Sequence, residues 1–137
     1  MESKTLRRLI FILAILLWAP IGWAKTYRLT STVLTPAATG EVKTDQDRNG
    51  NVEVEVKVEH LAKPAMLKSP ATMYVVWFRE EGKPPVNQGQ LRVDNNLKGR
   101  LKTTTTHRKF EVFLTAEKDP MVQGPSDYAV LRATIQE

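Results

Sequence analysis

Apolar and polar residues alternate along the chain in short runs, and this pattern predicts β-strands. In the clearest run, residues 51–60, four valines at alternate positions point to one side and charged residues to the other: Val52, Val54, Val56 and Val58. Just upstream, Asn49-Gly50 is a dipeptide typical of tight hairpins, so residues 40–46 are expected to form the preceding strand. The four valines are therefore predicted to face an apolar core.

Six further segments have the composition of strands: residues 27–34, 73–79, 90–94, 99–106, 110–116 and 128–136. Residues 73–79 are apolar on both faces, which predicts a strand covered on each side or flanked by an aromatic surface patch. No segment has the apolar period of an amphipathic helix. About eight strands at this spacing predict an all-β fold, a two-sheet antiparallel sandwich with an immunoglobulin-like layout. Residues 62–72 are expected to cross from one sheet to the other.

Residues 1–24 have the three parts of a signal peptide: basic residues, an apolar run over residues 9–18, and small residues before the expected cleavage point after Ala24. The alternative is an uncleaved anchor. It is disfavoured because the run is shorter than the roughly 20 apolar residues of a membrane-spanning helix and is followed by Pro20. We therefore expect one domain over residues 25–137, without a membrane span after leader removal, in an extracytoplasmic location, periplasmic or secreted.

Composition limits the classes of function. Removing the leader lowers the formal net charge from +5 to +3, because three of its residues are basic and one is acidic. The basic stripe of a nucleic-acid-binding domain is therefore missing. Without cysteine the chain has no disulfide and no thiol for a lipid anchor. We expect a monomer with a single apolar core, stabilised by packing alone.

Several short motifs follow one another over residues 39–135. They are Thr39-Gly40-Glu41-Val42, the alternating valine run ending at Leu61, Tyr74-Val75-Val76-Trp77-Phe78, Gly82-Lys83-Pro84, Gly89-x-Leu91-x-Val93-Asp94, Phe110-x-Val112 and Gly124-Pro125. In this order they resemble the extracytoplasmic C-terminal domain of anti-sigma-K factors. The resemblance implies an all-β extracytoplasmic domain. Because a short leader stands where such factors have a sigma-binding domain and a membrane helix, it implies a free-standing secreted relative of the sensor module, without sigma-factor binding.

Motifs for metal or catalytic chemistry are incomplete. Residues 45–50 match the first half of a calcium loop, but position 12, which should be a bidentate glutamate, is Val56. His60 and His107 have no further ligand at metal spacing. No nucleophile elbow, phosphate-binding glycine loop or nucleophile-and-base pattern is present in the sequence. We therefore predict no metal, no cofactor and no enzymatic activity.

Trp77 and Phe113 are the candidate partner-binding residues. By strand parity, Trp77 lies opposite the inward residues of 73–79, and Phe113 lies opposite the inward residues of 110–116. If the two strands are neighbours, the rings would form an exposed platform for a glycan or an envelope protein. The alternative is that the parity of 73–79 is reversed and Trp77 fills the core.

Six basic residues between positions 92 and 109 could contact acidic polymers at an envelope surface, or could form a solvated strand face: Arg92, Lys98, Arg100, Lys102, Arg108 and Lys109. Taken together, the sequence predicts an exported, non-enzymatic binding or sensor-like module of the cell envelope. The alternative is a structural or adhesive envelope subunit that self-associates through its sheet edges.

The valine strand makes a first testable prediction. Val56→Asp should unfold the domain, because losing buried methyls costs about 1 kcal/mol or more and an unpaired buried carboxylate adds several, against a total stability of about 5–15 kcal/mol. Glu55→Lys, on the solvent side, is expected to change the free energy of unfolding by less than about 0.5 kcal/mol. Denaturant titration measures both, and similar midpoints would contradict the strand assignment.

Overall fold

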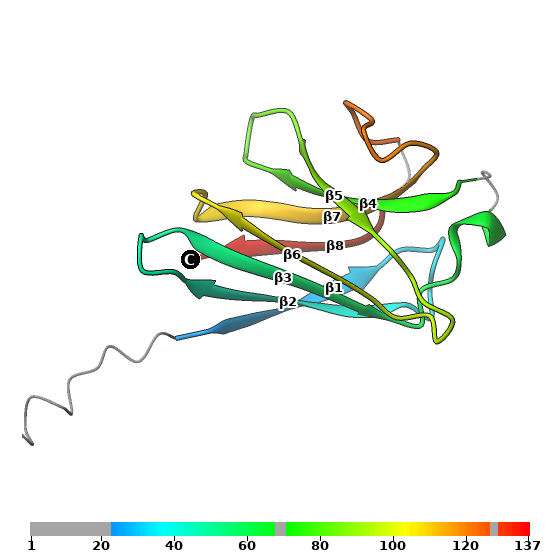
Figure 1. Cartoon of the computed structure of the whole chain (residues 1–137), viewed down its shortest axis with the longest axis horizontal. Helices are drawn as coiled ribbons and strands as arrows, with labels where there is room; N and C mark the ends of the chain where they lie inside the picture. The colour runs from blue at the N-terminus through cyan, green and yellow to red at the C-terminus, as the bar shows by residue number, and fades with distance from the viewer. Residues whose placement is uncertain (1–22, 68–70, 127–128) are drawn as a thin grey trace, which may run out of the picture.

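The computed structural model describes residues 23–67, 71–126 and 129–137, which form an all-β structure of antiparallel strands (Figure 1). The eight strands are β1 (Lys25–Ser31), β2 (Thr39–Gln46), β3 (Val52–Glu59), β4 (Met73–Arg79), β5 (Val86–Leu91), β6 (Gly99–Thr105), β7 (Lys109–Glu117) and β8 (Ala129–Gln136). One 3-10 turn, η1 (Pro64–Met66), lies between β3 and β4. The all-β prediction is confirmed. The expected leader lies outside the described residues, apart from Trp23 and Ala24.

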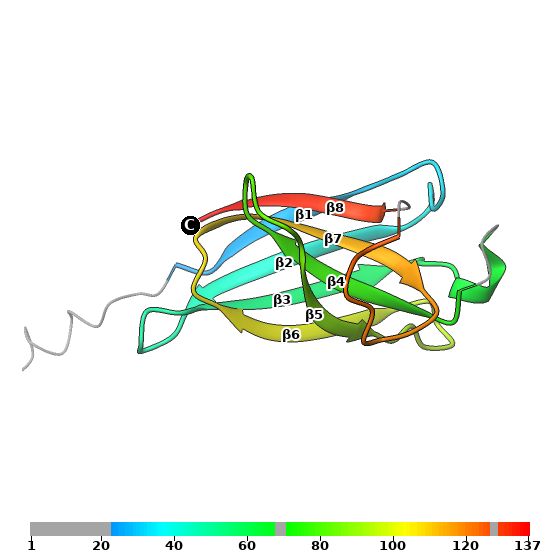
Figure 2. The same cartoon turned by 90° about the horizontal axis from the view of Figure 1, so that it is seen from above.

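The strands form one continuous, nearly closed sheet in the order β5-β4-β7-β8-β1-β2-β3-β6. β1 joins the two halves of this sheet, because residues 25–29 pair with β2 while Thr30 and Ser31 pair with β8. The sheet therefore curls into a flattened barrel (Figure 2). Two separate sheets in an immunoglobulin-like sandwich are not confirmed. Among the described residues, no helix has the length and apolarity needed to cross a membrane.

β5 is displaced from its predicted position. The pattern predicts a strand over 90–94 that begins after Gly89, whereas β5 begins at Val86 and contains Gly89. The reason is a β-bulge, at which the pairing of β5 with β4 shifts between Val76 and Trp77. Gly89 has a φ of 122°, which suits a residue without a Cβ at this irregularity.

The predicted β2–β3 hairpin forms around Asp47. The Asp47 N–H donates to the Asn51 carbonyl (2.9 Å), and Asp47 Oδ1 accepts the backbone N–H groups of Asn49 (2.8 Å) and Asn51 (2.9 Å). The side chain of Asn51 donates to the other carboxylate oxygen (2.9 Å). These hydrogen bonds, the Asn51 side chain first, hold the pKa of Asp47 below its ordinary value. The carboxylate of the calcium-like segment thus stabilises a turn.

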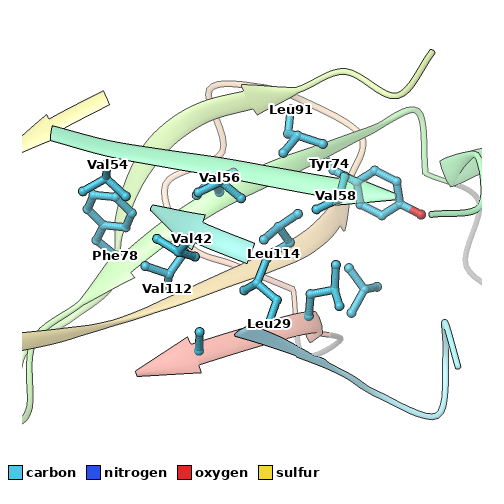
Figure 3. Packing of buried hydrophobic residues seen from close by; sticks show 14 of the residues in the cluster. Leu29, Val42, Val54, Val56, Val58, Tyr74, Phe78, Leu91, Val112 and Leu114 are labelled. Carbon is cyan, nitrogen blue, oxygen red and sulfur yellow. The ribbon is translucent and has the colours of Figure 1, made fainter. Parts of the chain in front are cut away.

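The apolar core fills the inside of the barrel. The four valines of β3 are buried on this inner face as predicted, with exposed fractions of 1% or less. Figure 3 shows three of them, Val54, Val56 and Val58. They pack against inward side chains of the opposite wall, among them Tyr74 and Phe78 of β4, Leu91 of β5 and Leu114 of β7. Period-2 alternation on both walls therefore builds one core.

A tyrosine hydroxyl forms a hydrogen bond with a backbone carbonyl at each end of the barrel. Tyr74 donates to the Ala62 carbonyl (2.6 Å), and burial raises its pKa to about 12. At the other end Tyr27 donates to the Gln136 carbonyl (2.5 Å), and the hydroxyl of Thr44 donates to the carboxylate of Glu137. The last residues of the chain are therefore held against β1 and β2.

Glu55 differs from the solvated residue that the alternation predicts. It lies on the outer face of β3, but only 15% of its side chain is exposed, and its carboxylate forms ion pairs with Arg100 and with Lys57 (3.4 Å). Partial burial acts to raise the pKa of Glu55, but the charges of Arg100 and Lys57 outweigh it and hold the pKa below its ordinary value. Glu53, two residues earlier, is exposed and lies opposite Asp45. The two glutamates therefore have opposite electrostatic surroundings.

These surroundings correct the expectation for Glu55→Lys. The substitution should lower the free energy of unfolding by about 1–2 kcal/mol, because it turns attraction to Arg100 and Lys57 into repulsion. Glu53→Lys is the matched control and should be neutral or slightly stabilising, since it removes repulsion from Asp45. Urea titration of both variants measures the difference, and equal losses would contradict the cross-strand pairs.

Candidate functional site

Trp77 and Phe113 do lie together. β4 and β7 are neighbours, the two residues are directly opposite in the register, and their rings stack with centroids 6.4 Å apart and planes at 16°. The guanidinium of Arg79 lies 5.2 Å from the centre of the Phe113 ring. Both rings are on the outer face of the barrel, because the inward residues of β4 are Tyr74 and its alternate neighbours. Of the two parities considered for residues 73–79, the structure has the one that places Trp77 opposite the inward residues.

Both rings are nevertheless buried. The exposed fraction is 0% for Trp77 and 5% for Phe113, and together with Val75 they form a second apolar cluster against Val122 and Ala129. The β7–β8 connection supplies this cover by folding back over the outer face of β4 and β7 (Figure 2). A second cluster of this kind explains why β4 is apolar on both sides.

Hydrogen bonds hold the cover in place. The indole N–H of Trp77 donates to the Thr115 hydroxyl (2.8 Å), which in turn donates to the carboxylate of Glu117 (2.5 Å). The same carboxylate oxygen accepts the backbone N–H of Ser126 (2.7 Å). On β5, the side-chain amide of Asn87 donates to two carbonyls of the connection, at residues 120 and 122. An exposed aromatic platform is therefore absent from this structure, and partner binding by Trp77 and Phe113 stays a prediction that requires the cover to move.

The histidines lie apart from each other. His107 pairs with Glu80 through Nδ1 and Oε1 (2.7 Å), which joins the β6–β7 turn to the β4–β5 turn. His60 is exposed at the end of β3, in the left-handed region with a φ of 55°. Among the described residues, no three His, Asp or Glu side chains are grouped to hold a metal ion.

The barrel is open between the edge strands β5 and β6, and we call this opening the seam. These strands are the two ends of the sheet order, so they pair with β4 and β3 and not with each other. They meet where Val93 bridges Gly99 and diverge from there, as both views show (Figures 1 and 2). The seam is therefore wedge-shaped, with its closed end at Gly99.

A tight hairpin makes the closed end. The Asp94 N–H donates to the Lys98 carbonyl (2.8 Å), and Asp94 Oδ1 accepts the N–H groups of Asn96 (2.8 Å) and Lys98 (3.0 Å). This repeats the arrangement around Asp47. Next to it, a Cβ on Gly99 would lie 2.5 Å from Leu91 Cδ2 and 2.9 Å from the Arg92 carbonyl oxygen, so glycine allows the two strands to touch here.

The register shows which backbone groups face the seam. In an antiparallel ladder, alternate residues of a strand bond to alternate neighbours. Because Asp47 and Asn51 form a hydrogen-bonded pair, the odd-numbered residues of β3 bond to β2 and the even-numbered residues bond to β6. On β6 the hydrogen-bonded partners are therefore Gly99, Leu101, Thr103 and Thr105.

The remaining residues of β6 direct their N–H and C=O groups away from β3. Arg100 follows Gly99 at the closed end, whereas Lys102 and Thr104 lie farther along β6, where β6 has no pairing with β5. The side chains of both are exposed. A hydrogen bond between Thr103 and the Gln88 side chain (3.4 Å) crosses the seam, at the upper limit of such a bond. The seam thus presents a short stretch of strand edge that is not paired with β5.

A groove of about 650 Å³ runs along β5, between residues 85–90 and the β7–β8 connection at residues 120–123. No charged residue lines it, and Val86 and Met121 at its margin are 57% and 73% exposed. The surface next to the seam is therefore neutral and partly apolar.

Comparison with known proteins does not identify the chain. No family model matches it, and no curated protein matches its sequence. The resemblance to the anti-sigma-K domain stays a prediction that rests on the order of its motifs. Function is therefore argued from the geometry of the seam.

Sequence reasoning did not find the seam. The signal that was present is the repeated spacing Asp-x-Asn, at Asp47 and at Asp94, which places the same hairpin at both positions. The basic run that begins at Arg92 was noted, but the pattern alone does not show that β6 is an edge strand. Strand order, which decides this, depends on contacts distant in sequence.

The seam predicts alternating amide exchange along β6. The N–H groups of Leu101 and Thr103 bond to β3 and should exchange slowly with solvent deuterium, whereas those of Lys102 and Thr104 should exchange rapidly. Residue-resolved hydrogen exchange by NMR measures this alternation, with Leu101 and Thr103 as internal controls. Slow exchange at all four positions would show that the seam is closed.

Proposed function

We propose that the protein is an exported, non-enzymatic binding module of the cell envelope that takes up an extended segment of a partner protein at the seam. The observation that carries this proposal is the set of outward backbone groups of Lys102 and Thr104, at the opening between the two end strands of the sheet order. Unpaired edge groups recognise the backbone of another strand, and this is a common mode of peptide binding.

Backbone recognition favours a protein partner over a glycan. A strand beside β6 would gain hydrogen bonds from Lys102 and Thr104, and its inward side chains would meet Leu101, which packs on the core. Extracytoplasmic location, the immunoglobulin-like layout and the likeness to an anti-sigma-K sensor module remain part of this proposal, since each agrees with a binding role. The alternative is self-association through sheet edges, which would use the same backbone groups of β6. The test below distinguishes it from binding of a different protein.

The test places a photo-crosslinking amino acid at Thr104 in the full chain, in the cell that makes it. The expected result is an adduct with a second protein, because Thr104 lies on the open edge. The matched control is Arg132 of β8, which is also exposed but pairs with β7 on one side and with β1 on the other. Adducts of equal yield at Arg132, or none at Thr104, would refute the proposal. An adduct of two copies of this chain would support the self-associating subunit instead.

A further inference from the structure

We propose that the segment bound at the seam is acidic, with Asp or Glu at alternate positions. This inference rests on the proposed function and adds the chemistry of the partner. It comes from the charges on the two strands that border the seam: β5 and β6 contain two basic residues, Arg100 and Lys102, and no acidic residue.

The charge of Lys102 is not balanced by an ion pair. Glu55 lies opposite Lys102 in the register, but its carboxylate pairs with Arg100 and Lys57. Within the described residues Lys102 forms no ion pair, and the same holds for Arg92 beside the closed end of the seam. The charge of Lys102 also helps to hold the pKa of Glu55 below its ordinary value. What borders the free backbone groups is therefore a positive charge that, in the described part of the chain, has no ion pair of its own.

An added strand would bring its side chains close to this charge. Residues directly opposite on antiparallel strands have Cβ atoms about 4.5–5.5 Å apart, and opposite charges at that distance attract. Side chains of the added strand on the outer face would lie beside Arg100, Lys102 and Thr104. Its inner positions would lie beside Leu101 and Thr103, which are half-buried, and so suit apolar or β-branched residues.

The same charges disfavour a second copy of the chain. If two β6 edges paired antiparallel about Lys102, each Lys102 would lie opposite the other, and like charges in direct opposition destabilise a sheet. Basic residues on edge strands commonly prevent such self-pairing. The positive charge of Lys102 would attract an acidic segment and repel a second copy of β6.

The probe is a peptide of alternating Asp and Val, about eight residues long, which is a usual strand length. Its control is the peptide in which Lys replaces Asp. Affinity for the full chain is measured by isothermal titration calorimetry at two salt concentrations, and amide exchange of β6 is followed by NMR. We expect the Asp-Val peptide to bind with an affinity that falls with salt and to slow amide exchange at Lys102 and Thr104, and the Lys-Val peptide to bind at least about tenfold more weakly.

Two substitutions at one position separate backbone from charge. Lys102→Ala keeps the N–H and removes the charge, and should weaken binding of the Asp-Val peptide about two- to fivefold. Lys102→Pro also removes the N–H that faces the seam, and should weaken binding of both peptides about tenfold or more. Proline is tolerated here because the ladder to β3 uses residues 101 and 103. If Lys102→Pro fails to fold by thermal melting, Thr104→Pro replaces it.

The outcomes distinguish the two proposals. Equal binding of both peptides, lost in Lys102→Pro, would retain strand addition and overturn the acidic specificity. Binding of the Asp-Val peptide that is unchanged by Lys102→Pro, or that leaves amide exchange of β6 unaltered, would overturn strand addition as well. Binding of neither peptide, with concentration-dependent assembly of the protein, would overturn both.

Discussion

The division of β1 between two neighbours is the constraint on which the rest of the structure depends. Its first residues pair with β2 and its last two pair with β8, so the halves of the sheet are held together by one strand of seven residues. Leu29 lies at this changeover and is buried in the core, which ties the change of partner to packing. The sheet must curl at this point, because a strand cannot remain flat while it joins two walls that face each other across a core.

Curling at β1 also decides where the barrel stays open. The ends of the strand order, β5 and β6, come together on the opposite side, and the hairpin at Asp94 connects them at one end only. Each is already bonded on its other side, β5 to β4 and β6 to β3. Their facing edges stay unpaired beyond the bridge between Val93 and Gly99, because the two strands diverge from that point. The seam is therefore a consequence of strand order, and its free backbone groups are available without any loss of core contacts.

The outer faces of the two walls are stabilised differently. Over β4 and β7 the face is apolar, and the β7–β8 connection covers it through the hydrogen-bonded series from Trp77 to Ser126. Over β2, β3 and β6 the face carries cross-strand charges, with Glu55 between basic residues. The first arrangement buries aromatic side chains within the chain itself. The second leaves charged side chains in solvent, next to the seam.

Alternation by itself determined most of the strands, with β5 as the exception, and the inward face of β3. The inward face of β3 could be assigned from sequence, because side chains of a strand alternate with a period of two whatever lies around it. The turn at Asp47 was equally local, since its hydrogen bonds join residues at most four apart. For Trp77 the sequence left two parities open, and the structure decided between them.

Only the tertiary structure decided the burial of the two rings, the surroundings of Glu55 and the opening at Lys102. Each of these depends on which distant segment lies alongside: the β7–β8 connection covers Trp77, β6 brings Arg100 to Glu55, and the separation of β5 from β6 leaves the edge at Lys102 free. Such neighbours are set by packing of the whole sheet around its core, and a local pattern carries no information about them.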